Sequence, residues 1–136
     1  MVKEPQLCLV PQSQIDTAVR QCGSLIEQAL EFDGTHALFD VLDSIRAGEA
    51  QLWLSTDEDG VKGIAVTCIT EYPQRTNCLI WLCAGIGREK FTPLIVNIEQ
   101  WAKAQGCASI SLEGRPGWEK VLADYEKTKI ILEKRL

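Results

Sequence analysis

Apolar residues in the first third of the chain recur at the spacing of helices. After Pro11 they repeat every three or four positions over four turns, which predicts one helix with a single apolar stripe: Ile15, Ala18, Val19, Cys22, Ile26, Ala29 and Leu30. The pair Asp33-Gly34 ends this pattern, and a second amphipathic helix is predicted from Thr35 until Gly48. The first third therefore predicts two helices that each bury one face.

From residue 51 the period of the apolar pattern changes to two, which is typical of strands. Gln51–Ser55 and Val61–Glu71 flank a polar turn and predict a β-hairpin. The next segment, Cys78–Ala84, is apolar on both faces. Because such a strand needs cover on both sides, it is predicted to lie in the middle of a sheet.

The remaining segments complete an α/β order. They predict a first strand over Leu7–Val10, a helix over Thr92–Gln105, a strand over Cys107–Leu112, a short helix over Trp118–Tyr125 and a last strand over Thr128–Leu136. The order β-α-α-β-β-β-α-β-α-β predicts an α/β fold, with a mixed central β-sheet flanked by helices on both faces. The 136 residues fit a single domain, 1–136.

Composition and charge narrow the classes of function. The chain is 46% apolar and 24% charged, as in ordinary globular proteins. Its net charge of −5 argues against a general nucleic-acid-binding protein. The basic cluster Lys127–Arg135 alternates with apolar residues and is interpreted as the solvated face of the last strand.

The sequence predicts neither a membrane span nor a secretory signal. Its longest apolar stretch, Cys78–Gly87, is too short to cross a bilayer. Residues 1–5 have no apolar core behind a basic start. We therefore expect the protein in the cytoplasm of the cell that makes it.

The sequence contains six cysteines, Cys8, Cys22, Cys68, Cys78, Cys83 and Cys107. No two of them form a C-x-x-C pair, and His36 is the single histidine, so no metal site is predicted. Most of the cysteines stand in apolar runs, which predicts buried thiols that form no disulfide.

The segment Ile98–Cys107, which reads IEQWAKAQGC, and the order of the predicted elements resemble the GNAT superfamily of acyl-CoA-dependent N-acyltransferases. The segment is similar to the third helix of that family and the start of the strand after it. The resemblance covers most of the chain in layout and about Cys78–Leu136 in sequence. More narrowly, Gln105-Gly106-Cys107 and the segment 114–118, which reads GRPGW, are similar to small acetyltransferase-like proteins of tailed bacteriophages and prophages.

The resemblance implies a binding site for acetyl-CoA. In this family the central strand splays from its neighbour and exposes backbone groups to the pantetheine arm, which implies that Leu82, Cys83 and Ala84 face the arm. The loop over residues 85–91 would meet the phosphates through backbone N–H groups and the positive end of the next helix. Four residues of this loop are candidates for the phosphate cradle: Gly85, Gly87, Arg88 and Lys90.

The loop departs from the pattern Q/R-x-x-G-x-G/A of the family. With the register set on Glu99 and Trp101, Ile86 stands at the first position, and Glu89 and Phe91 stand where the family has glycine. A carboxylate would face a diphosphate and two side chains would crowd it, each at a cost of about 1–3 kcal/mol from desolvation or strain. We therefore expect a degenerate pyrophosphate loop that binds acetyl-CoA weakly.

Acyl transfer to an amine also needs a base and an acid. Glu71, at the end of the long strand, is the candidate base. Tyr125 is the candidate acid, because Tyr125-Glu126-Lys127 is similar to the Tyr-Glu-Lys of the family. In another register Tyr125 is the aromatic residue of a Gly-Phe/Tyr pair and belongs to the core. His36 is interpreted as a surface residue.

Two functions of different classes stay open. The first is transfer of an acetyl group from acetyl-CoA to an amine, with weak or no catalysis. The second is a non-catalytic interaction module, a structural or assembly protein of a bacteriophage particle that is incorporated in the virion. Its partners would be other proteins of the particle or further copies of the chain. Neither function calls for nucleic acid, a membrane or a metal.

Overall fold

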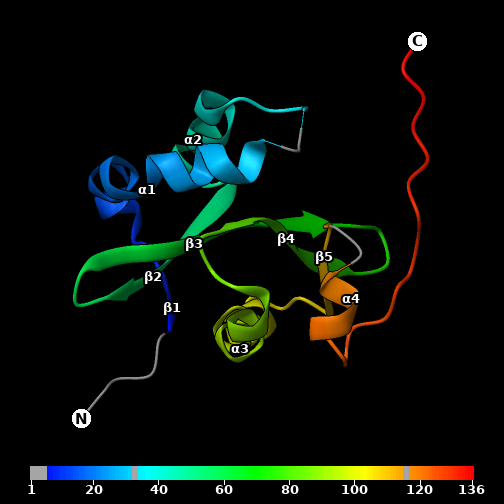
Figure 1. Ribbon diagram of the computed structural model, residues 1–136. Coiled ribbons are helices and arrows are strands. Elements are labelled where there is room, and N and C mark those ends of the chain that lie inside the picture. The colour runs from blue at the N-terminus through cyan, green and yellow to red at the C-terminus, as the bar shows by residue number, and fades with distance from the viewer. Residues whose placement is uncertain (1–5, 32–33, 115–116) are drawn as a thin grey trace.

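The computed structural model describes residues 6–31, 34–114 and 117–136, and the side chains of these residues except 88, 89, 119 and 121. A five-stranded sheet in sequential order runs through its centre: β1 (Leu7–Leu9), β2 (Ala50–Asp57), β3 (Gly60–Glu71), β4 (Thr76–Ala84) and β5 (Ser109–Leu112). The first four strands are antiparallel neighbours, whereas β5 runs parallel to β4 (Figure 1).

Helices cover both faces of the sheet (Figure 1). On one face lie α1 (Ile15–Leu30), which follows the 3-10 turn η1 (Gln12–Gln14), and α2 (Leu38–Arg46). On the other face lie α3 (Arg88–Ala104) and the short α4 (Trp118–Val121). The parallel β4–β5 pair results from this order, because a crossover through α3 returns the chain to the same end of the sheet.

The core under α1 and α2 follows directly from the helical stripe in the sequence. Ile15, Ala18, Cys22 and Ile26 of α1 are buried, together with Val41 and Ile45 of α2, and they pack on Leu52, Ile64, Val66 and Leu82 of the sheet. Each large apolar side chain buried here stabilises the fold by about 1.5–3 kcal/mol. The predicted stripe of the first helix is confirmed.

The core under α3 is equally apolar. Its buried residues come from the helix, namely Phe91, Leu94, Ile95, Ile98 and Ala102, and from strands beneath it, among them Trp53, Ala65, Cys78 and Ile80. Trp53 donates its Nε1–H to Thr67 Oγ1 at 3.0 Å, and Thr67 donates to Gln51 Oε1 at 2.9 Å. This chain of hydrogen bonds satisfies the polar groups that the core encloses.

The predicted fold class is confirmed, a mixed α/β fold with helices on both faces of the sheet. The predicted central position of Cys78–Ala84 is also confirmed, since β4 lies between β3 and β5 and every residue of it is buried or half-buried. Among the described residues, no helix has the length and hydropathy that a bilayer span requires.

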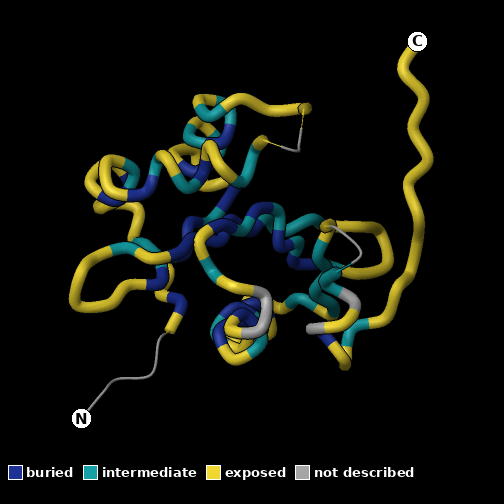
Figure 2. The backbone as a smooth tube through the Cα atoms, in the orientation of Figure 1, coloured by how far each residue is buried: buried dark blue, intermediate teal, exposed yellow. Residues whose placement is uncertain are grey.

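Several predicted elements differ in the structure; the short helix expected over Trp118–Tyr125, for example, ends at Val121. The helix expected from Thr92 begins four residues earlier, at Arg88, so the loop after β4 is reduced to residues 85–87. The prediction of a last strand over Thr128–Leu136 is wrong, because these residues form no secondary structure and are exposed throughout (Figure 2). An apolar pattern forms a strand only where it pairs with a neighbouring strand, and this segment pairs with none of the described strands.

Candidate functional site

The candidate site begins where the pairing of β5 with β4 ends. The two strands pair from Asn77, opposite Ser109, to Ile80, opposite Leu112. Side chains tie the strands together at the closed end: Asn77 donates to Ser111 Oγ at 2.9 Å and accepts from Ser109 Oγ at 2.8 Å. Beyond Ile80, none of the strands that the structure describes pairs with this edge of β4. All four residues of β5 pair with β4, so the second half of β4 is open because β5 ends opposite Ile80.

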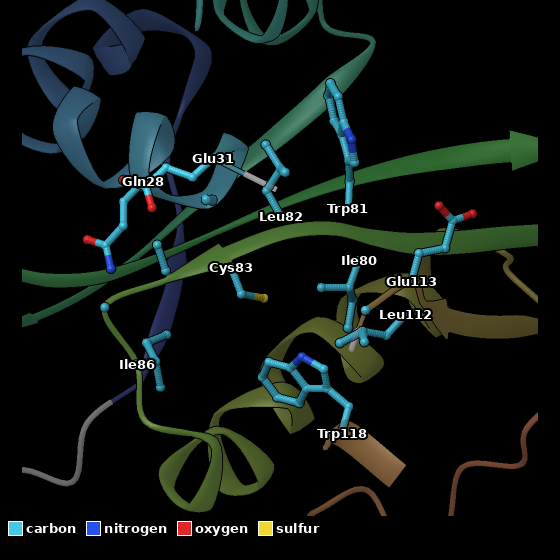
Figure 3. Close-up of a pocket in the computed structure, with 14 residues that line it drawn as sticks. Gln28, Glu31, Ile80, Trp81, Leu82, Cys83, Ile86, Leu112, Glu113 and Trp118 are labelled. Atoms are coloured by element: carbon cyan, nitrogen blue, oxygen red, sulfur yellow. The ribbon is translucent and has the colours of Figure 1, made fainter. Parts of the chain in front are cut away.

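A cleft of about 520 Å³ opens where β5 ends (Figure 3). Its lining comes from four parts of the chain: Gln28, Ala29 and Glu31 at the end of α1, residues 80–86 along β4 and the loop after it, residues 112–114 after β5, and Trp118 of α4. In Figure 3, Trp81 and Leu82 point to the α1 side of β4, whereas Cys83 points to the side of Trp118. Both sides of the strand thus contribute to the cleft.

A β-bulge in β4 explains why neighbouring side chains share a side. In the pairing with β3, Val66 lies opposite Leu82 and Thr67 lies opposite Ile80, so that Trp81 has no partner. The extra residue shifts the alternation of side chains and bends the strand locally. Trp81 packs its indole edge-on against the imidazole of His36, with 4.9 Å between the ring centroids.

Two glycines bring the end of β4 close to β3. Gly85 has a φ of 80°, in the left-handed region that glycine adopts at little cost, and a Cβ there would collide with the carbonyl oxygen of Lys62. A Cβ at Gly63 would collide with the side chain of Ile86. The turn after β4 therefore needs glycine at position 85, and the facing part of β3 needs glycine at position 63.

The charged side chains that line the cleft are acidic. Glu31 and Glu113 stand at its rim, both exposed, and the lining described by the structure includes no lysine or arginine. Burial raises the pKa of the Cys83 thiol to about 12, so the thiol is neutral at pH 7 and a poor nucleophile. The cleft therefore offers backbone groups, apolar surface and two carboxylates. No group of three metal-ligating side chains gathers in the described part of the chain.

Part of the expected cofactor site comes together in the cleft. Leu82, Cys83, Ala84 and Gly85 all line it. Gly87 is not part of the lining; it precedes α3, and its carbonyl accepts a hydrogen bond from the Lys90 backbone at 3.0 Å.

The other loop positions do not line the cleft as the resemblance implied. Lys90 is exposed in the first turn of α3 and is not part of the lining. The side chains of Arg88 and Glu89 lie outside the described residues. Phe91 is fully buried in the core and meets Trp118 edge-on at 5.0 Å between ring centroids, so it does not crowd the loop as expected.

The two candidate catalytic residues lie elsewhere. Glu71 is exposed at the far end of β3, paired with Thr76. The cleft begins four residues further along β4, at Ile80, which is roughly 13 Å away at the rise of a strand. The cleft and Glu71 are therefore at different places on the sheet.

Tyr125 packs half-buried against the core under α3, and its hydroxyl donates to Glu99 Oε2 at 2.6 Å. Burial, followed by the hydrogen bond to the Glu99 carboxylate, raises the pKa of Tyr125 above its ordinary value. A phenol held neutral in this way is a poor acid, and the environment is that of a core residue, as the second register of the sequence implied.

Several lining residues carried no signal in the sequence. Gln28 and Glu31 stand at a helix end, where polar residues are common, and Glu113 precedes a turn. Trp118 stood out only as the first residue of a short predicted helix. These residues come together around the open half of β4, and the sequence alone does not show that β5 ends opposite Ile80.

The arrangement of the whole chain matches solved structures closely. An aminoglycoside N-acetyltransferase in complex with CoA superposes with a TM-score of 0.70 and 14% sequence identity, over 100% of this chain and 98% of that one. A GNAT family acetyltransferase from Staphylococcus aureus gives a TM-score of 0.68 and 14% identity, over 98% of this chain and 100% of the other. The chain has the GNAT fold.

The same fold serves proteins with other descriptions. A transcriptional regulator from Bacillus halodurans matches with a TM-score of 0.67 and 11% identity, over 97% of this chain and 99% of that one. No protein-family model matches the sequence, and none of the curated proteins compared with it does either. At these identities the likeness concerns the GNAT fold alone, and any ligand or reaction of this chain depends on the residues of its own cleft.

Proposed function

We propose that this chain binds the pantetheine arm of an acyl-CoA thioester weakly in the β4–β5 cleft, and that it transfers the acyl group to an amine slowly or not at all. The observation that carries the proposal is the unpaired edge of β4 after Ile80, within a cleft of about 520 Å³. Unpaired backbone N–H and C=O groups there can hydrogen-bond the amides of an extended arm, as an added strand would.

The charges around the cleft support weak binding. Glu31 and Glu113 line it, and no basic side chain of the described lining compensates them. The phosphate groups of an acyl-CoA would therefore meet a negative local potential. Among the described features, the positive end of α3, which follows Gly87 and carries Lys90 in its first turn, favours an anion.

The chemistry supports slow transfer. Neither Glu71 nor Tyr125 lines the cleft, and Tyr125 is held neutral against Glu99. Glu113 directly follows β5 and lines the cleft, but it is exposed, and no hydrogen bond to a described residue fixes its position. A base without a fixed position contributes little to proton transfer.

Titration with acetyl-CoA tests the proposal. Calorimetry should give a Kd in the high micromolar range or weaker, and a parallel NMR titration should move the amide signals of residues 82–87 and the indole signal of Trp118. Submicromolar binding would contradict the degenerate loop. Shifts confined to another surface, or none at millimolar ligand, would exclude the cleft as the binding site.

A charge variant sharpens the test. Glu89→Gln removes one negative charge from the second position of α3 and keeps the helix propensity, so it should tighten acetyl-CoA binding by a few-fold. Glu49→Gln, an exposed change in the connection before β2, is the matched control and should leave the Kd unchanged. Release of CoA thiol in the presence of small amines measures turnover, which should be barely above the uncatalysed rate.

A non-catalytic interaction module is the second candidate function. One observation favours it, the open edge of β5 together with an exposed apolar C-terminal segment. Such features are typical of surfaces that pair with another chain. A role in a bacteriophage particle stays a prediction of the sequence resemblance, and co-purification of the chain with particles from an infected culture would test it.

A further inference from the structure

The cleft has a polar side and an apolar side. Gln28 and Glu31 come from the end of α1, and Trp81 points to the same side of β4 (Figure 3). On the other side, the side chains that line the cleft all belong to the apolar cluster under α3: Ile80, Cys83, Ile86, Leu112 and Trp118. Cys83 counts as apolar because its thiol is neutral at pH 7. We call these five residues the α4-side wall.

Most of the α4-side wall faces the cleft rather than the closed core. Ile80 is buried, whereas the other four side chains are half-buried. Apolar side chains that converge on a cavity in this way leave a surface that a ligand covers. In Figure 3 the carboxylate of Glu113 points away from the Trp118 indole. An apolar group, rather than a phosphate or an ammonium group, therefore fits this wall.

Packing holds the Trp118 indole in the wall. Its ring meets the fully buried Phe91 edge-on, with 5.0 Å between the ring centroids. On another side it lies directly against Gly114, where a Cβ would come within 2.7 Å of Trp118 Cδ1 and 2.9 Å of Leu112 Cδ2. Both contacts are made within the chain itself, so the wall is formed before any ligand binds.

The wall lies at the end of the cleft where a bound thioester would carry its acyl group. In the proposed function the phosphates lie near the start of α3, and the arm follows the open edge of β4 from Gly85 towards Ile80. The far end of the arm then reaches the point where β5 ends, since Leu112 lies opposite Ile80. An acyl group longer than acetyl continues from there along the apolar side chains of the wall.

We propose that the α4-side wall binds the acyl chain of the thioester and that Trp118 determines which chain is preferred, an apolar acyl group of about four to eight carbons over acetyl. The inference rests on the proposed function, because it needs a thioester in the cleft. Each methylene that leaves water against the wall tightens binding by up to about four-fold. Trp118 acts as a specificity-determining residue and takes no part in bond formation.

Calorimetric titration with acetyl-CoA and hexanoyl-CoA tests the preference. The unmodified chain should bind hexanoyl-CoA about ten-fold or more tightly than acetyl-CoA, because four further methylenes leave the water. Trp118→Ala should reduce this ratio of Kd values to about three-fold or less, because the largest side chain of the wall is lost. Equal affinity of the unmodified chain for both thioesters, or an unchanged ratio in Trp118→Ala, would overturn the proposal.

Trp81→Ala is the matched control, because it removes an indole from the opposite side of β4. It should keep the ten-fold ratio of Kd values, whatever its effect on each value. A ratio that is lost in Trp81→Ala and kept in Trp118→Ala would place the acyl chain on the α1 side, against the proposal.

A second variant of the wall serves if Trp118→Ala fails to fold, as shown by circular dichroism. Leu112→Thr makes the wall more polar at the end of β5 and keeps a residue that strands accept. The folded variant should also lower the preference for hexanoyl-CoA. A full ten-fold ratio in this variant would contradict the proposal.

A probe without CoA separates this inference from the proposed function. Methyl hexanoate carries the same chain without a nucleotide or a pantetheine arm. At millimolar concentration it should shift the indole N–H signal of Trp118, which is the signal absent from Trp118→Ala, and not that of Trp101, which packs on Trp53 and is not part of the described lining. If methyl hexanoate shifts the Trp118 signal but neither thioester binds, the proposed function is wrong and the wall still takes an apolar chain. If both thioesters bind equally and methyl hexanoate leaves Trp118 unchanged, the thioester site stands and the wall has no role in selecting the acyl group.

Discussion

At the scale of single residues, two glycines of this chain occupy opposite environments. Gly23 lies in the middle of α1, where a Cβ would meet nothing within 4 Å. Gly85 ends β4 with a φ of 80° and lies directly against the backbone of Lys62. The sequence shows both simply as glycine, and only the packing tells which of them the fold requires.

Substitution of each glycine by alanine should therefore change stability in opposite directions. Gly85→Ala combines an unfavourable left-handed conformation with a collision, and we expect the free energy of unfolding to fall by about 2 kcal/mol or more. Gly23→Ala should raise it by about 0.5–1 kcal/mol, because alanine favours the helix. Urea denaturation of both variants measures the difference. Equal effects of the two changes would mean that the β3–β4 contact is not as close as described.

Phe91 shows what a family pattern can miss at this scale. The aligned register gave it the place of a loop glycine, and the apolar pattern of the next helix was taken to start after it. In the structure the residue is fully buried among Trp118 and the residues of α3. A large aromatic side chain next to a predicted helix favours burial in the core for physical reasons, and Phe91 is buried in this way.

At the scale of elements, the apolar periods predicted nearly every helix and strand. The apolar stripe of α1 and the apolar residues on both faces of β4 predicted these elements well, because burial of the same residues holds each element in the fold. The start of α3 was missed because Pro93 suits the first turn of a helix, and the structure places it one turn further in. The bulge at Trp81 could not be predicted, since a strand that is apolar at every position shows no break in alternation.

The first turn of α3 should accordingly be a structural part of the helix. Phe91→Ala should lower the free energy of unfolding by about 3–5 kcal/mol, because it leaves a cavity under the helix. Val96→Ala, at a position of the same helix that is 43% exposed, is the control and should change it by about 0.5 kcal/mol or less. Chemical denaturation followed by tryptophan fluorescence compares the two. If Phe91→Ala were as mild as the control, the residue would lie in a loop after all.

At the scale of the whole molecule, the sequence predicted the layers and the place of the cleft but not its chemistry. Leu82–Ala84 were expected to face a ligand from the resemblance, and they line the cleft because β5 ends opposite Ile80. Glu71 was chosen for its position at a strand end. It pairs with Thr76 next to the β3–β4 turn, whereas the cleft begins at Ile80, where β5 ends.

The buried thiols also give the whole molecule a dependence on pH. Burial raises the pKa of Cys22 to about 11 and that of Cys78 to about 12, both from 9.0. The negative charges that Cys107 and Cys68 would carry as thiolates raise the pKa of Cys78 further. In the unfolded chain these thiols lose their protons near pH 9, whereas in the folded chain they keep them. Because the unfolded state then binds fewer protons, the stability supplied by the neutral thiols is complete below pH 9 and is lost as the pH rises towards 11 or 12.

We therefore expect the free energy of unfolding to fall between pH 9 and pH 11, by up to about 1.4 kcal/mol per pH unit for each such thiol. Cys78→Ala lowers stability at every pH by removing a buried side chain, but its loss between pH 9 and pH 11 should be smaller than that of the unmodified chain. Cys8→Ala, a change at an exposed thiol, should keep the slope of the unmodified chain. Urea denaturation at pH 8, 9, 10 and 11 under reducing conditions measures the three slopes. Identical slopes for Cys78→Ala and Cys8→Ala would show that the thiol at position 78 is open to water, and hence that the core under α3 is less closed than the burial of Cys78 and Phe91 implies.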